Sequence, residues 1–470
     1  MTRHHHTLLV LSGTAISQDL SVTHTFEDGK TALAAEVNKN FSDVVTGVNA
    51  IVRKDDTLFN TASGYQALFQ NTTGGSNTAS GFRALYKNTT GSFNTANGYV
   101  ALFSNTSGSG NTASGYQVLG NNITGQLNTA SGYRALFNNT EGQANTASGA
   151  EALLSNTTGS FNTASGYQVL QKNITGQLNT AIGQGALFEN TEGSSNSAIG
   201  VQALNRNTTG HYNTASGTGA LNKNTSGESN TASGVEALYF NTTGKNNTAS
   251  GTAALINNTS GDSNTASGFQ ALATNTTGNN NTAIGYTADV TTGALTNATA
   301  IGFNAKVNAS NKVRIGNTDV GVIEGQVPFS ASSDARLKEN ITVVDVGLAL
   351  VNDLNPVSYH RINSSSDDIE MGLLAQEVEE VLATHGLSNS GMVHQASEDA
   401  YRSVRYNDLL APMINAIQEL DDASEAKDAQ IATLQEQLQS QQEELLALVQ
   451  SQQEQIADLR RMVEHQFAVN

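Results

Sequence analysis

The chain has 470 residues, of which 44 are Gly, 3 are Pro and 14% are charged, and it lacks Cys and Trp. This length predicts two or three structural units rather than one core, and the lack of cysteine excludes disulfides and thiolate metal sites. Most of the net charge of -18 comes from residues 334–470, which hold 24 acidic and 8 basic residues, so the chain lacks the basic surface that DNA or RNA binding requires.

Residues 1–17 resemble a short signal peptide. They have a basic start at Arg3, an apolar run over residues 7–16 and small residues from Ala15 to Ser17 as a cleavage site. A disordered leader or a misplaced start codon is the alternative. No run in the sequence approaches the ~20 apolar residues of a membrane-spanning helix.

The N-terminal region, residues 18–59, contains one predicted helix. Apolar residues recur there at helical spacings of three and four, namely Leu33, Val37, Phe41, Val45, Val48 and Ile51. This pattern predicts an amphipathic helix over residues 31–53, which is expected to pair with its copies in an oligomer.

A repeat of 17 residues fills residues 60–316. The motif Asn-Thr-Ala-Ser-Gly begins at Asn60 and returns every 17 residues as far as Asn281, and the same frame holds at Ala298. A constant period predicts a solenoid with one coil per repeat. Each copy has only a few small and apolar residues, so the coils must stack to bury a core; in the first copy these are Ala62, Gly64, Ala67 and Leu68.

Each coil is predicted to consist of short β-strands and tight turns, because the repeat is rich in Thr, Ser and Tyr and contains N-T-T-G turns. A single helical turn over the Y-Q-A-L-F stretch is the alternative. Since Asn and Thr recur at one site per coil, their side chains are expected to form hydrogen-bonded ladders along the axis. A Thr and Asn face that binds glycan or ice is the functional alternative, whereas the regular Asp of calcium-binding solenoids is missing.

The repeats over residues 60–316 resemble the head repeats of trimeric autotransporter adhesins, whose T-A-I-G core appears at Thr180 to Gly183 and at Thr299 to Gly302. The resemblance implies a left-handed parallel β-roll that forms a homotrimer around a threefold axis. The chain departs from that family at its C-terminus, where a Gln- and Glu-rich helix replaces membrane-anchoring β-barrel strands. It is therefore not expected to anchor or export itself as that family does.

Four sequence blocks follow a linker at residues 317–332. They are S-S-D-A-R-L-K-E-N-I from Ser332, L-N-P-V-S-Y from Leu354, M-G-L-L-A-Q-E-V from Met371 and V-R-Y-N-D-L-L from Val404. In this order they resemble the C-terminal intramolecular chaperone domain of endosialidase tailspikes and other phage fibres, a serine autopeptidase module. The resemblance covers residues 330–470 and implies trimer assembly followed by release of the domain. The chaperone core is predicted over residues 333–410 and a coiled-coil helix over residues 411–470.

The resemblance makes Ser333 the nucleophile, Lys338 its activating partner and Ser333–Asp334 the scissile bond. A serine hydroxyl needs a base to attack a carbonyl near neutral pH, and a lysine that loses its proton in a desolvated pocket is such a base. If a helix begins at Asp334, Ser333 caps it and Lys338 lies on the same first turn. The alternative is that Ser333 is only a helix cap and Lys338 only a solvated charge.

Gly372 and Gln376, in the third block, are candidate accessory residues. A close backbone and an amide donor would stabilise an oxyanion there, whereas the alternative is a packing glycine and an ordinary helix residue. His360, His385 and His394 lack metal-ligand spacing, so no metal site and no cofactor are predicted.

The C-terminal helix carries apolar and Gln residues at alternating spacings of three and four, namely Ile431, Leu434, Leu438, Gln441, Leu445, Leu448, Gln452, Gln455, Leu459 and Met462. This heptad seam predicts a coiled coil. The heptads leave the number of strands open, and three strands follow only from the resemblances.

Together these parts predict a mainly β-solenoid fold followed by an α+β chaperone module and a coiled coil. The predicted function is a secreted homotrimeric fibre or adhesin-like protein of a cell surface or virion appendage, with an unknown surface receptor or glycan as partner. Its chemistry is at most a single-turnover Ser–Lys autopeptidase, since each Ser333 acts once.

Two other functions remain open. A tailspike-like, glycan-degrading protein with the same maturation module would need two carboxylates about 5–9.5 Å apart in a cleft. The repeats offer only scattered acids, such as Glu141, Glu151, Glu189 and Glu192. The other hypothesis is an intracellular structural protein that uses cleavage as a release switch.

Overall fold

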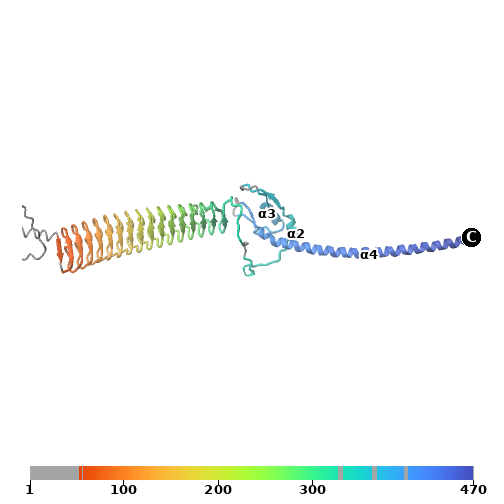
Figure 1. The fold of residues 1–470 in the computed structure, drawn as a ribbon, viewed down its shortest axis with the longest axis horizontal. Helices are drawn as coiled ribbons and strands as arrows, with labels where there is room; N and C mark the ends of the chain where they lie inside the picture. The colour runs from red at the N-terminus through yellow and green to blue at the C-terminus, as the bar shows by residue number, and fades with distance from the viewer. Residues whose placement is uncertain (1–51, 56, 327–331, 363–367, 396–400, 469–470) are drawn as a thin grey trace, which may run out of the picture. The chain divides into compact units, whose positions relative to one another are not determined.

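A computed structural model describes residues 52–55, 57–326, 332–362, 368–395 and 401–468 (Figure 1). The chain divides into two compact units, one ending at Gly316 and one beginning at Asn317. The predicted signal peptide and most of the predicted N-terminal helix lie outside the described residues. The last two residues of that helix, Val52 and Arg53, lie instead in strand β1, so the helix prediction is wrong there. Backbone pairing of β1 with the first coil overrides the helical spacing of the side chains.

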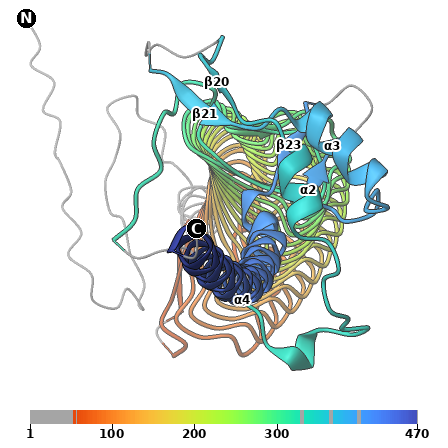
Figure 2. The same ribbon diagram turned by 90° about the vertical axis from the view of Figure 1, so that its right-hand side faces the viewer.

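The first unit is a β-solenoid of about 15 turns. One strand per coil pairs in parallel with the strand 17 residues further along the chain, as between Thr146 and Thr163. Figure 2, which looks along the solenoid, shows the coils superposed on one another. The parallel strands are β2 (Asn60–Ser63), β3 (Thr78–Ser80), β4 (Thr95–Asn97), β5 (Thr112–Ser114), β6 (Thr129–Ser131), β7 (Thr146–Ser148), β8 (Thr163–Ser165), β9 (Thr180–Ile182), β10 (Ser197–Ile199), β11 (Thr214–Ser216), β12 (Thr231–Ser233), β13 (Thr248–Ser250), β14 (Thr265–Ser267), β15 (Thr282–Ile284), β17 (Thr299–Ile301) and β19 (Val313–Ile315).

The two ends of this sheet differ from its middle. At the N-terminal end, β1 (Val52–Asp55) pairs antiparallel with β2, which places the sequence V-R-K-D on the edge of the sheet. At the other end the last coil is shorter, since Thr299 pairs with Val313. There β16 (Asp289–Val290) and β18 (Lys306–Val307) form a second, two-stranded parallel sheet.

Each coil buries a thin apolar core, as the composition of the repeat predicts. In the sixth coil, Ala147 of β7 points inward, and Ala152 and Leu153 are fully buried. Glu151 and Leu153 have φ values of 58° and 53°. A right-handed helical turn does not contain such residues, so the alternative of a helical turn in this stretch is wrong. The left-handed backbone costs about 1–2 kcal/mol per L-residue, and burial of a leucine side chain, about 1.5–3 kcal/mol, offsets that cost.

Two ladders of buried asparagines connect successive coils. In the strand-leading ladder, Asn247 donates to Asn230 Oδ1 through both its backbone N (3.0 Å) and Nδ2 (3.1 Å). In the N-T-T-G ladder, Asn241 Nδ2 donates to Asn224 Oδ1 (2.8 Å) and to the carbonyl oxygen of Gly244 (3.0 Å). These side chains are fully buried and hydrogen-bonded, so the predicted ladders are confirmed.

The glycine after each strand allows the coils to stack closely. Gly149 has a φ of +131°, and a Cβ on it would overlap the carbonyl oxygen of Gly166 in the next coil.

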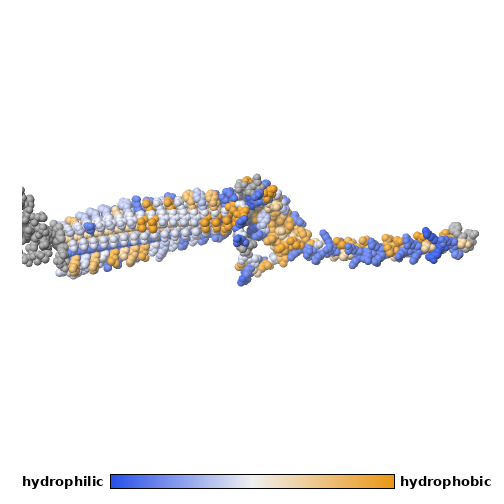
Figure 3. All heavy atoms as spheres, in the orientation of Figure 1, coloured by the Kyte–Doolittle hydropathy of each residue, from blue (hydrophilic) through white to orange (hydrophobic). Residues whose placement is uncertain are grey.

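Outward-facing side chains of successive coils form rows along the solenoid (Figure 3). One row stacks the rings of neighbouring coils with centroids 5.1–5.5 Å apart; it consists of Tyr65, Phe82, Tyr99, Tyr116 and Tyr133.

The second unit contains short helices, two small sheets and one long helix. Its elements are η1 (Ala335–Leu337), α2 (Leu348–Asp353), β20 (Val357–Tyr359), β21 (Glu370–Gly372), α3 (Ala375–Thr384), β22 (Val393–His394), β23 (Ser403–Val404), η2 (Tyr406–Leu409) and α4 (Leu410–Ala468). Strands β20 and β21 pair antiparallel, as do β22 and β23. A small core joins α2, α3 and η2; it consists of Leu350, Val378, Leu382, Met392 and Leu409.

Helix α4 holds α2 in place by a capping contact. The Glu419 carboxylate accepts a hydrogen bond from the backbone N of Leu348 (2.8 Å), which satisfies a free donor at the start of α2.

None of the helices in the described ranges is long and apolar enough to span a lipid bilayer.

Replacing a ladder asparagine by aspartate is expected to destabilise the solenoid. In Asn241→Asp, the carbonyl oxygen of Gly244 and Asn224 Oδ1 lose their donor inside the core, so we expect the free energy of unfolding to fall by about 2–4 kcal/mol. Asn246→Asp makes the same chemical change at an exposed site of the same coil and is the matched control. Urea unfolding followed by circular dichroism compares them, and equal midpoints would contradict the role of the ladder.

Candidate functional site

Ser333 and Lys338 lie on either side of η1, a 3-10 helix of one turn. Lys338 Nζ donates a hydrogen bond to Ser333 Oγ at 2.7 Å. The 3-10 helix Ala335–Leu337 separates them in the chain, and the backbone is extended again at Lys338. The two residues that sequence reasoning assigned to nucleophile and base are therefore in contact.

The local capping differs from the prediction. Asp334, not Ser333, is the N-cap residue, since Asp334 Oδ1 accepts from the backbone N of Arg336 at 2.9 Å. The helix also ends at Leu337, so Lys338 has an extended backbone and does not lie in the helical turn as predicted. An aspartate is as good an N-cap as a serine, and here its carboxylate also binds the Arg336 side chain. The Ser333 hydroxyl is consequently left for Lys338.

The Asp334 carboxylate is held in its charged form. The Arg336 side chain donates to Oδ1 from Nε (3.0 Å) and to Oδ2 from Nη2 (2.6 Å). These bonds, and then the one from the Arg336 backbone, lower the pKa of Asp334 below its ordinary value, while Asp334 raises the pKa of Arg336. Asp334 is therefore a capping anion at neutral pH rather than a proton donor.

The Ser–Lys pair is open to water in the single chain. Ser333, Asp334 and Lys338 are all exposed. A lysine acts as a base only when its amine is neutral, and burial is what favours the neutral amine. The contact thus supplies the geometry of a nucleophile and its base without the desolvation that the chemistry requires.

Gly372 lies against two tyrosine hydroxyls. It ends β21, and a Cβ on it would lie 2.5 Å from the Tyr406 hydroxyl oxygen and 3.2 Å from that of Tyr359. The same Tyr406 hydroxyl accepts a hydrogen bond from the backbone N of Leu373 at 2.9 Å. This geometry favours the packing role of Gly372, because only glycine leaves room for the Tyr406 hydroxyl.

An ion pair lies next to this glycine on the β20–β21 hairpin. Arg361 Nε donates to Glu370 Oε1 at 2.7 Å and Arg361 Nη2 to Glu370 Oε2 at 3.0 Å. The bonds from Arg361 lower the pKa of Glu370, and a bond from Tyr359 lowers it further. Tyr359 therefore connects the ion pair to the surroundings of Gly372.

Gln376 is exposed in the first turn of α3. Among the described residues, no hydrogen bond joins Gln376 or Gly372 to Ser333 or Lys338.

The histidines of this unit take ordinary roles. His385 Nε2 lies 2.8 Å from Asp353 Oδ2, which ties the end of α3 to α2, while His360 and His394 are exposed. Within the described ranges no group of three His, Cys, Asp or Glu side chains is arranged to hold a metal ion.

Sequence reasoning missed the tyrosines around Gly372. A signal existed, because Tyr359 ends the second block and Tyr406 stands in the fourth block. Their convergence on the third block comes only from the fold.

Two acidic residues of the solenoid that are candidates for glycan cleavage bind side chains of neighbouring coils. Glu151 Oε2 accepts from Gln168 Nε2 (2.9 Å) and Gln171 Nε2 (2.7 Å). Glu189 pairs with Lys172 at 3.3 Å. These contacts give both carboxylates a structural role on the solenoid surface.

Residues 333–387 match the model of a protein family described as chaperone of endosialidase. The match begins at Ser333 and spans the Ser–Lys pair, the hairpin and α3. No curated protein matches the chain. The chain thus joins a β-solenoid to a segment of the endosialidase-chaperone type.

Substitutions at Gly372 and Tyr406 are expected to be energetically coupled. Gly372→Ala forces a methyl group against the Tyr406 hydroxyl, at a cost of about 1–3 kcal/mol. Tyr406→Phe loses the bond from Leu373, about 0.5–1.5 kcal/mol, but removes the clashing oxygen. The double variant should therefore lose less stability than the sum of the losses in the two single variants. Hydrogen exchange of residues 357–387 measures this, and strictly additive losses of protection would contradict the contact.

Proposed function

We propose that the chain is a homotrimeric fibre or adhesin-like protein of a cell surface or virion appendage, whose C-terminal module guides trimer assembly and is then released by cleavage at Ser333. The observation that carries this proposal is the 2.7 Å hydrogen bond from Lys338 to Ser333 at the first residue of the chaperone-type segment. A repetitive solenoid followed by such a segment is what a tail-fibre-like protein with a chaperone module requires.

Exposed apolar side chains on the solenoid support its association with other copies. Ile182, Ile199, Ile284 and Ile301 occupy outward-facing strand positions where most coils have Ser, and all four are exposed. Apolar residues grouped on a surface mark contacts with another chain. We assign these positions to a trimer of left-handed β-rolls, as the resemblance to adhesin heads implies.

The long helix supports self-association in the same way. Ile431, Leu434 and Leu438 of its heptad seam are 51%, 55% and 56% exposed in the single chain. A seam with this period is buried when identical helices wrap around one another. The proposed trimer thus has a coiled coil at its C-terminal end.

One route for cleavage uses the Ser333 hydroxyl as the nucleophile. Its Oγ attacks the carbonyl carbon of Ser332, its proton passes to the neutral amine of Lys338, and the Ser333 nitrogen takes that proton as the C–N bond breaks. Water then hydrolyses the resulting ester, and the released module begins at Ser333. Because both side chains are exposed in the single chain, the proposal requires that assembly bury them.

Cleavage of the Ser333–Asp334 bond, which the resemblance implies, needs another nucleophile. Attack of Ser333 Oγ on its own carbonyl would form a strained β-lactone. Instead, water attacks the Ser333 carbonyl carbon, Lys338 accepts a water proton, and the Asp334 nitrogen leaves with that proton. The two routes release modules that differ by one serine residue, which mass analysis distinguishes.

Substitution of Lys338 is expected to abolish cleavage by either route, whereas substitution of Ser333 abolishes only the route in which its hydroxyl is the nucleophile. The wild-type chain should yield two fragments, and Lys338→Ala should cleave at least about a thousandfold more slowly. Ser333→Ala should be slowed as much if the module begins at Ser333. Ser332→Ala, a neighbouring exposed serine, is the matched control and should cleave like the wild type. Denaturing electrophoresis with intact mass analysis measures the fragments, and sedimentation measures the trimer.

Two results would contradict the proposal. Cleavage of Lys338→Ala at the wild-type rate would remove Lys338 from the mechanism. An uncut but trimeric wild type would make the module a retained assembly domain.

The glycan-degrading alternative is tested separately. With Glu151 and Glu189 held by neighbouring coils, we expect no release of reducing ends from surface polysaccharides by the purified trimer. A reducing-sugar assay measures this. Activity that survives Ser333→Ala and is lost in Glu151→Gln would instead establish the tailspike function.

A further inference from the structure

The apolar seam of helix α4 does not follow one heptad frame along its whole length. We infer that at Leu445 the seam moves by one residue, so that Val449, Ile456 and Val463 enter the core between parallel copies. Leu448, Gln455 and Met462 then move to its border. The occupant of this surface is the same helix of another copy, so the inference rests on the proposed function.

The first part of α4 follows a strict alternation of three and four. Its seam positions are Leu410, Met413, Ile417, Leu420, Ser424, Lys427, Ile431, Leu434, Leu438, Gln441 and Leu445. Continued in the same frame, the seam runs through Leu448, Gln452, Gln455, Leu459, Met462 and Gln466. That continuation puts Gln at half of its positions, including two successive layers at Gln452 and Gln455.

A single extra step of four after Leu445 gives a more apolar seam. It runs through Val449, Gln452, Ile456, Leu459, Val463 and Gln466. Val449, Ile456 and Val463 are 44%, 53% and 49% exposed in the single chain and recur every seven residues. Val or Ile at one core position with Leu at the other is a pattern of parallel coiled coils. Two successive steps of four constitute a stutter, which locally unwinds the supercoil.

The charged residues change places between the two frames. Leu459 is a core residue in both, but Asp458 lies beside the core in the unbroken frame and on the outer surface in the shifted frame, where its Oδ1 pairs with Arg461 Nη2 at 3.1 Å. The shift puts Arg460 beside the core instead, so the apolar positions, and not the charges, favour the shifted frame.

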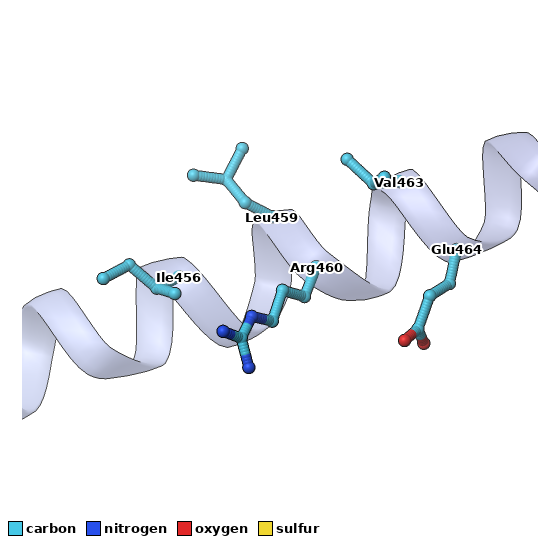
Figure 4. A pocket seen from close by; sticks show the side chains of 5 residues that line it. All are labelled: Ile456, Leu459, Arg460, Val463 and Glu464. Atoms are coloured by element: carbon cyan, nitrogen blue, oxygen red, sulfur yellow. The ribbon is translucent and has the colours of Figure 1, made fainter.

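The surface of the helix agrees with this placement. Ile456, Leu459 and Val463 line a shallow depression together with Arg460 and Glu464, and Figure 4 shows the three apolar side chains following one side of the helix. In a coiled coil such a depression between four residues receives a side chain of the facing helix. A second copy has the same interruption at the same height, whereas an uninterrupted heptad partner would lose register beyond Leu445.

Because the chain has no cysteine, single cysteines report which residues face one another. In the full chain under mild oxidation, Ile456→Cys should form interchain disulfides at least about fivefold faster than Gln455→Cys, because the bond requires Cβ atoms roughly 3.5–4.5 Å apart. Val463→Cys against Met462→Cys repeats the comparison if a substitution at Ile456 impairs folding. Leu438→Cys lies in the core in both frames and reports whether the helices associate.

The outcomes separate the two proposals. If Leu438→Cys cross-links but Gln455→Cys reacts as fast as Ile456→Cys or faster, the oligomer stands and the frame shift is wrong. If Leu438→Cys does not cross-link, the parallel oligomer fails and the inference fails with it.

Discussion

The solenoid depends on hydrogen bonds made by buried asparagine side chains between coils. Its core of alanines and one leucine per coil is too thin to set the spacing of the coils by itself. An amide such as that of Asn241 satisfies a backbone carbonyl of its own coil and the asparagine of the preceding coil. An extra residue between two ladder asparagines would move them out of register, which explains why the spacing is 17 from Asn60 to Asn281.

The strand-leading ladder of asparagines ends at Asn281. Asn281 Oδ1 accepts from the backbone N of Ala298, but alanine has no amide to continue the ladder. The coil that begins at Ala298 is shorter, and in the coil before it the buried Asp289 binds Thr274 and Lys306. The strand-leading asparagine is thus lost one coil before the second unit begins at Asn317.

The second unit combines an apolar core with an exposed contact between Ser333 and Lys338. Leu350, Val378 and Leu382 pack together, whereas Ser333 and Lys338 contact each other in water. In the proposed mechanism assembly would desolvate this pair, and desolvation would then control when the lysine can accept a proton. In the proposed trimer the same event would align the chains and permit the cut.

The sequence by itself determined the features that depend on local spacing. The 17-residue period predicted the coils and the asparagine ladders, and the resemblance of the four blocks to the endosialidase chaperone predicted that Ser333 and Lys338 act as a pair. Only the tertiary structure decided the strand at Val52 and Arg53, the left-handed leucine in each coil and the Tyr406 hydroxyl over Gly372. These features arise from pairing and packing between residues distant in the chain, and such contacts override the local preference of each residue.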